Sequence, residues 1–167
     1  MTRLSRVLSV YHLFRNCQEV SFEELRQQLG ASEKTFLRDI RLLERAGVLA
    51  VRYGRKYRAF YPVSLEPRPM AEEDNQTRRK YLEKLRRLCL LMVRMAEETE
   101  WSGTGRVELY QELFPEQSDR TRQRDYRELE QLGYYARYEK EFDDEPGRWW
   151  YEIPGTYGLA TIPGMRW

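Results

Sequence analysis

Apolar residues recur with helical spacing in three successive segments at the start of the chain. In the first segment they are Leu4, Val7, Leu8, Tyr11 and Phe14. This spacing predicts an amphipathic helix. The second segment, SFEELRQQLG (21–30), opens with a capping-box pattern and closes on a glycine, which predicts a second helix with a defined start and end.

The third segment begins at Ser32 and ends at Gly47. Ser32 is a typical N-cap residue, and Phe36, Ile40 and Leu43 share one face of the expected helix. Only about two residues separate this helix from the second one, which is the length of a helix-turn-helix connection.

The hydrophobic period then changes. Residues 48–63, VLAVRYGRKYRAFYPV, are rich in β-branched and aromatic side chains and are interrupted once, at Gly54-Arg55. We interpret them as two antiparallel strands around a tight turn. Three helices followed by a hairpin is the order of elements in a winged helix.

The same pattern returns later in the chain. Segment 32–47, SEKTFLRDIRLLERAG, matches segment 118–133, SDRTRQRDYRELEQLG, at eight of sixteen positions. Upstream, the alignment pairs three further positions with one extra residue in the turn: Val107, Tyr110 and Phe114 with Phe22, Leu25 and Leu29. Downstream, YYARYEKEF and RWWYEI flank the turn DDEPG and predict a second hairpin.

The sequence therefore predicts a mainly α fold with small β-hairpin wings, of the α+β class, built as two tandem winged helix-turn-helix units. We place the first unit at 1–64, a linker at 65–77, the second unit at 78–154 and a tail at 155–167. A long helix over about 77–98 begins the second unit. Its broad apolar surface is explained either by packing between both units or by a homodimer interface, which we favour.

Charge separates the two halves of the chain. The net charge is +2 overall, but residues 1–67 hold 12 Lys and Arg against 7 Asp and Glu, which leaves −3 for the remainder. A polyanion is therefore expected to prefer the first half.

Basic and polar side chains gather on the exposed face of the third helix and on the first hairpin. As candidate DNA contacts we select Ser32, Lys34, Thr35, Leu37, Arg38, Arg41 and Arg45 on the helix, and Arg52, Arg55, Lys56 and Arg58 on the hairpin. The start of such a helix can reach base edges in the major groove, while a basic wing grips phosphates. Asp39 and Glu44 interrupt this face, and we expect them to pair with arginines.

The corresponding helix of the second unit offers a possible second surface for DNA, for another protein or for a second copy of the chain. Its candidate residues are Arg120, Gln123, Arg124 and Arg127. Arg122, however, stands where the first unit has Phe36, so either its aliphatic stem packs in the core or the helix is rotated. The second wing carries acidic residues that would repel phosphates: Glu139, Glu141, Asp143, Asp144 and Glu145.

Little in the sequence indicates catalysis. There is one histidine, His12, which we interpret as a surface or boundary residue, and the two cysteines lack metal-ligand spacing. We expect no enzymatic activity, no metal and no cofactor. The longest clear apolar run, LCLLMV (88–93), is too short for a membrane span, and no signal peptide is evident.

The stretch KTFLRDIRLLERAGV, preceded by FEELRQQLGAS, resembles the N-terminal winged helix-turn-helix of DeoR-like bacterial transcription regulators and of WYL-type regulators. The matching positions are Ser32, Thr35, Phe36, Arg38, Asp39, Leu43 and Gly47. The resemblance covers about residues 3–63 and implies sequence-specific binding of duplex DNA, usually by a dimer. Those regulators carry a sensor domain, whereas here a second winged unit is expected in its place.

From these observations we expect a cytoplasmic, nucleoid-associated bacterial transcription regulator that binds double-stranded DNA, with a possible protein partner. Two alternatives remain. One is a protein–protein adaptor built from tandem winged helices, and the other is an initiator of plasmid or phage replication.

Overall fold

The computed structural model describes residues 1–98, 102–140 and 147–155, and within them the fold is a mixture of α and β structure. The first half contains α1 (Arg3–Asn16), β1 (Val20–Ser21), α2 (Phe22–Leu29), α3 (Glu33–Arg45), β2 (Ala50–Gly54) and β3 (Ala59–Ser64). The second half contains α4 (Gln76–Glu97), α5 (Arg106–Leu113), α6 (Asp119–Glu130), β4 (Tyr135–Glu139) and β5 (Arg148–Glu152). The α+β class is therefore confirmed.

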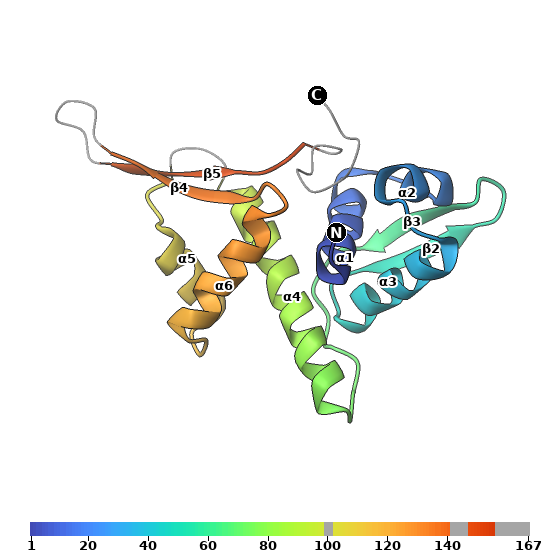
Figure 1. The fold of residues 1–167 in the computed structure, drawn as a ribbon, viewed down its shortest axis with the longest axis horizontal. Coiled ribbons are helices and arrows are strands. Elements are labelled where there is room, and N and C mark those ends of the chain that lie inside the picture. Colours follow the sequence, from blue (N-terminus) through green and yellow to red (C-terminus); the bar gives the residue numbers. More distant parts are fainter. Residues whose placement is uncertain (99–101, 141–146, 156–167) are drawn as a thin grey trace.

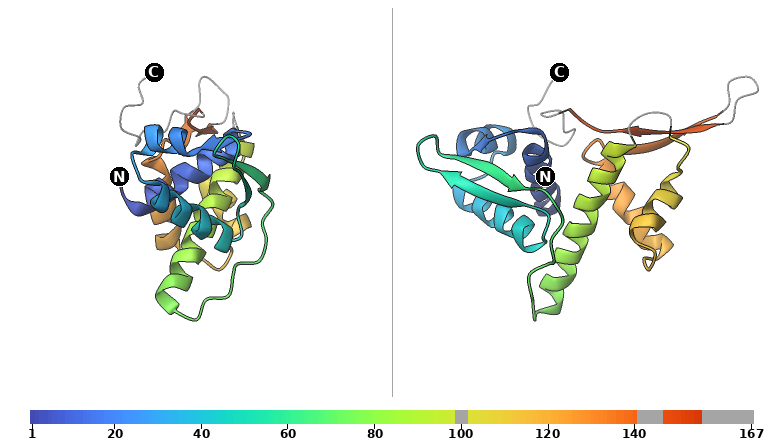
Figure 2. Two further views of the ribbon diagram at one scale, coloured as in Figure 1. Left: turned by 90° about the vertical axis from the view of Figure 1, so that its right-hand side faces the viewer. Right: turned by 180° about the vertical axis from the view of Figure 1, so that it is seen from behind.

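Both halves follow the same order along the chain, with three helices and then a hairpin (Figure 1). The two hairpins point away from one another at opposite ends of the molecule, and α3 and α6 lie on opposite sides of α4 (Figures 1 and 2). No helix in the described part of the chain is long and apolar enough to cross a bilayer.

The predicted helix boundaries are confirmed where a cap marks them. Ser32 Oγ accepts a hydrogen bond from the Thr35 amide, and Ser118 Oγ accepts one from Thr121 in the same way. Ser21 and Glu24 form the complete capping box. Each of the glycines that follow these helices has a positive φ: Gly30, Gly47 and Gly133.

One strand was not predicted. β1 is two residues long and pairs antiparallel with β3, joining Val20 to Phe60 and Ser21 to Ala59, so that the sheet order is β1–β3–β2. In the second half, Ser102 makes an isolated bridge to Trp149 of β5. A strand of two residues is too short to show the alternation of apolar and polar residues by which strands are predicted.

The predicted alignment of the two halves was wrong by one residue before the turn. α2 and α5 both span eight residues, so Arg106 takes the place of Phe22 and fully buried Leu109 that of Leu25. Val107, which was expected in the core, is exposed. Three residues separate α2 from α3 and five separate α5 from α6, so the turn is longer by two residues.

The helix α6 is not rotated relative to α3. Its buried residues Asp125, Tyr126 and Leu129 occupy the positions of Asp39, Ile40 and Leu43 in α3. Tyr126, Leu129 and Leu132 are buried in the core, without a rotation of the helix, and Arg122 is mostly covered. Its side chain lies in the Phe36 position, and only 14% of it is exposed.

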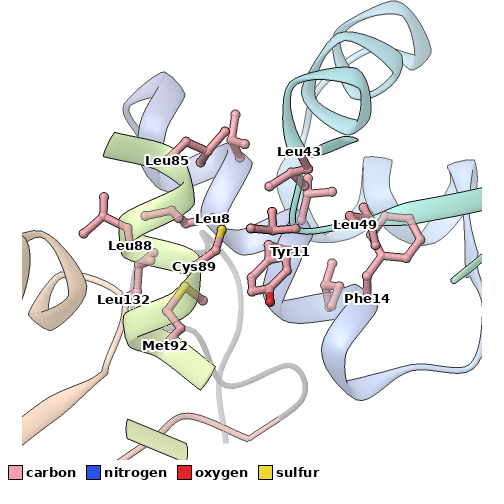
Figure 3. Close-up of a cluster of buried hydrophobic side chains, with 14 of the residues drawn as sticks. Leu8, Tyr11, Phe14, Leu43, Leu49, Leu85, Leu88, Cys89, Met92 and Leu132 are labelled. Atoms are coloured by element: carbon pink, nitrogen blue, oxygen red, sulfur yellow. The ribbon is translucent and has the colours of Figure 1, made fainter. Parts of the chain in front are cut away.

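The helix α4 packs between the halves. Figure 3 shows Cys89 facing Leu8 and Tyr11 of α1, while Leu88 and Met92 lie on the side of Leu132 in the second half. Seven residues of α4 are buried within the chain: Leu82, Leu85, Leu88, Cys89, Leu91, Met92 and Met95. Tyr81, Leu90 and Val93 are half-buried, so packing between both halves covers most of the apolar surface of α4.

A buried ion pair recurs in both halves. Arg6 of α1 donates from Nε and Nη2 to the two carboxylate oxygens of Asp39, at 2.7 and 3.0 Å. Arg87 of α4 makes the same two-bond contact with Asp125, at 2.5 and 3.1 Å. The expectation that Asp39 pairs with an arginine is confirmed, but the pair lies in the core and ties α3 to α1, because Asp39 is only 1% exposed.

Candidate nucleic-acid interface

Three basic side chains form a stripe along the outer face of α3. Lys34, Arg38 and Arg41 follow one another at spacings of four and three residues, which places them on one side of the helix. All three are exposed. Within the described part of the chain, no carboxylate lies within ion-pair distance of any of them.

The other predicted residues at the start of α3 have local structural contacts. Ser32 caps the helix, and its hydroxyl lies 3.1 Å from the Thr35 hydroxyl. Leu37 is half-buried and packs against the hydrophobic core. Ser32 remains exposed and Thr35 is partly exposed, so both flank the basic stripe.

Arg45, at the end of α3, is engaged within the chain. Its Nη2 lies 2.6 Å from a carboxylate oxygen of Glu73, and the Arg45 carbonyl accepts a hydrogen bond from the Ala71 amide. The hydrogen bond from Arg45 lowers the pKa of Glu73, which keeps that carboxylate charged. Arg45 therefore fastens α3 to the segment before α4, a contact that sequence spacing alone did not reveal.

The β2–β3 hairpin presents four exposed cations: Arg52, Arg55, Lys56 and Arg58. Arg52 lies over the ring of Tyr61 at 5.5 Å, and Lys56 lies over Tyr57 at 5.3 Å. Arg58 adopts a φ of 47° and pairs with Glu33 at 2.6 Å, which joins the turn of the hairpin to the start of α3. Both side chains of this pair are more than half exposed, so water competes strongly for them.

The helix α6 repeats the basic stripe with arginine at each position. Arg120, Arg124 and Arg127 stand where α3 has Lys34, Arg38 and Arg41, and all are exposed. Gln123, also exposed, replaces the half-buried Leu37. Of the acidic residues predicted in the second wing, Glu139 is exposed at the end of β4, and the other four lie outside the described residues.

The prediction that His12 is a surface or boundary residue was wrong. Its side chain is 1% exposed, with Nδ1 2.5 Å from the Tyr134 hydroxyl and Nε2 2.8 Å from the Gly155 carbonyl. His12 therefore links α1 to the second half. Among the described residues, no group of three or more His, Cys, Asp or Glu is arranged to hold a metal ion.

No protein-family model, curated protein or solved structure matches this chain.

Proposed function

We propose that the protein is a sequence-specific duplex DNA-binding protein that regulates transcription, with α3 lying in the major groove. The stripe of Lys34, Arg38 and Arg41 carries this proposal. Its cations are exposed on one helix face and have no ion-pair partner in the described part of the chain.

The helix is suited to read base edges. Arg38 lies in the second turn of α3, where its guanidinium can donate two hydrogen bonds to guanine O6 and N7. Lys34 can donate to the same edge or to a phosphate, and Thr35 offers a hydroxyl and a methyl group nearby. The Arg6–Asp39 pair and the packing of Phe36 hold α3 in place, so little backbone order has to be gained on binding.

The hairpin supplies phosphate contacts beside the helix. The contact between Arg58 and Glu33 brings the turn that carries Arg55 and Lys56 next to the start of α3. Cations on two adjacent elements can neutralise phosphates on both sides of one groove, and the release of condensed counterions then favours binding.

The order of elements supports a tandem winged-helix interpretation, since both halves have three helices followed by a hairpin. A regulator in the bacterial cytoplasm, bound to the nucleoid, is the role that the DeoR-like resemblance of the first half suggests. A homodimer that binds a palindromic site remains part of the proposal. Because most of the apolar face of α4 is buried within the chain, the second unit is the favoured surface for that pairing.

Selection from a pool of random duplexes at two salt concentrations tests the proposal. We expect the whole chain to enrich one motif, with affinity that falls steeply with salt. A palindromic motif would indicate two copies on one site. Retention without an enriched motif would contradict sequence-specific binding.

Three variants then separate the contacts. Arg38→Ala should cost about 1–3 kcal/mol and relax the preference at one base pair, whereas Arg55→Ala should weaken binding to all sequences and reduce the salt slope by about 1. Arg15→Ala removes an exposed arginine from the end of α1 and serves as the control. An Arg38→Ala variant that binds its motif as tightly as Arg15→Ala does would remove α3 from the interface.

A further inference from the structure

Two positions that hold core phenylalanines in the first half hold arginines in the second. Phe22 and Phe36 are 9% and 0% exposed, at the start of α2 and in α3. Their counterparts are Arg106, at the start of α5, and Arg122 in α6. Arg106 is exposed, whereas only 14% of the Arg122 side chain is exposed. A charge at a mostly covered position is costly, so the exchange of Phe36 for Arg122 in particular calls for a chemical reason.

The surroundings of Phe22 and Arg106 each contain a pair of neighbouring aromatic rings. In the first half, Phe22 packs edge-on against Phe60 at 5.2 Å, and Tyr53 lies beside Phe60 at 5.0 Å. In the second half, the Arg106 guanidinium lies over the Trp149 ring at 5.8 Å, and Tyr138 lies beside Trp149 at 5.5 Å. Both halves thus have a pair of aromatic rings at this place, Tyr53 with Phe60 and Tyr138 with Trp149. Arg106 replaces the Phe22 ring that packs against this pair in the first half.

In the first half, Phe22 lines a hollow of about 300 Å³ together with two carboxylates, Glu23 and Glu33. Arg106 and Arg122 line a hollow in the second half. Its volume is about 310 Å³, and its polar walls come from Arg106, Arg122, Gln123, Arg127 and Glu130. Three cations therefore face one carboxylate around the hollow. Arg122 also contacts Asp119 at 2.7 Å, but that carboxylate is 79% exposed and the pair is correspondingly weak.

We propose that this hollow binds a phosphate group. Arginine forks match the oxygens of phosphate with two parallel hydrogen bonds, and the Gln123 amide can donate a further bond. The space is large enough for a phosphate together with part of the group to which it is esterified, and Val107 and Tyr126 offer apolar surface to that group.

Two sources share this chemistry, the backbone of a nucleic acid and a small phosphorylated molecule. Arg127 belongs both to the hollow and to the exposed stripe of α6, so a phosphate of bound DNA can reach the site from the surface. The proposal does not depend on DNA binding by α3, because the hollow lies entirely in the second half.

Titration of the whole chain with inorganic phosphate, followed by amide and arginine side-chain NMR, tests the site. We expect shifts centred on Arg106, Arg122 and Arg127. Arg127→Ala changes an exposed side chain and should weaken binding on the order of tenfold or more. Arg122→Phe installs the residue of the first half and should abolish binding while the fold is kept.

Arg124→Ala is the matched control, because Arg124 is an exposed arginine of the same helix that does not line the hollow. It should change phosphate affinity less than about twofold. Equal losses in Arg124→Ala and Arg127→Ala would show a diffuse charge effect and overturn the proposal, as would shifts spread over both halves.

Phenyl phosphate and a short duplex DNA, added to the Arg38→Ala variant, identify the source. Displacement of inorganic phosphate from the hollow by DNA would assign the site to the backbone. Tighter binding of phenyl phosphate, without competition from DNA, would assign it to a small molecule. Failure of all three probes to shift the arginines would refute the phosphate site but would leave DNA binding by α3 untouched.

Discussion

The two halves of the molecule share a scaffold but distribute charge differently over it. Each buries an aspartate of its third helix against an arginine of its first, and each begins that third helix with a serine cap. In the first half the core behind these features is aromatic and the cations lie on the outer face. In the second half, cations occupy the outer face as well, and Arg122 stands at the position of the buried Phe36. The repeated ion pair thus belongs to the scaffold, and the surplus arginines point to function.

The largest effect on stability is expected when the residues at the equivalent positions 36 and 122 are exchanged between the halves. Phe36→Arg places a charge at a site that is 0% exposed, and the lost packing and uncompensated charge should together cost about 5 kcal/mol or more. Arg122→Phe should leave stability unchanged or raise it. Urea denaturation of both variants measures the effect, and a comparable loss in both would show that Arg122 is structural.

The buried ion pairs provide the next test. Removing either aspartate leaves an arginine without its partner, which costs about 3–5 kcal/mol. Asp125→Ala should show the larger loss of the two. Asp125 also accepts a hydrogen bond of 2.6 Å from the Tyr110 hydroxyl. In addition, the Arg87 side chain is 15% exposed, against 22% for Arg6, so water compensates less for the lost partner. Thermal unfolding measures the stability of both variants. A lower stability of Asp39→Ala than of Asp125→Ala would contradict this ranking.

The smallest changes in the free energy of unfolding are expected when the hydroxyl of a single tyrosine is removed. Tyr110→Phe removes a buried hydrogen bond to Asp125 and should cost about 1–3 kcal/mol. Burial raises the pKa of Tyr110, with the neighbouring carboxylate adding to it, so this hydroxyl stays protonated and able to donate.

Tyr81→Phe is the control for that substitution. The Tyr81 hydroxyl is buried and has no hydrogen-bond partner in the described part of the chain, so its removal should be neutral or stabilising. Chemical denaturation of the two variants side by side checks the difference. Equal losses would mean that the Tyr110–Asp125 bond contributes nothing specific.

Local signals predicted most of the fold. Caps, terminal glycines and the change of period located the helices and hairpins of both halves, because those features act over a few residues. The two-residue strand β1 was missed because its pairing partner lies on β3, about forty residues away in sequence.

The candidate site was predicted less completely, for the same reason. The sequence shows that Lys34, Arg38 and Arg41 share one helix face, but not that Arg45 is held by Glu73. Arg106 was missed because an insertion of two residues in the turn hid its equivalence to Phe22. The burial of His12 depends on Tyr134 and Gly155, far along the chain, which no local pattern indicates.

The position of α4 also has a consequence during synthesis on the ribosome. The nascent chain completes β3 at Ser64, but the side of α1 that carries Leu8 and Tyr11 is covered only once α4, which ends at Glu97, has emerged. At a translation rate of about 5–20 residues per second, the 33 residues between these points take roughly 2–7 seconds. For that interval we expect the newborn first half to expose an apolar surface, of the kind that makes partly folded chains prone to aggregation.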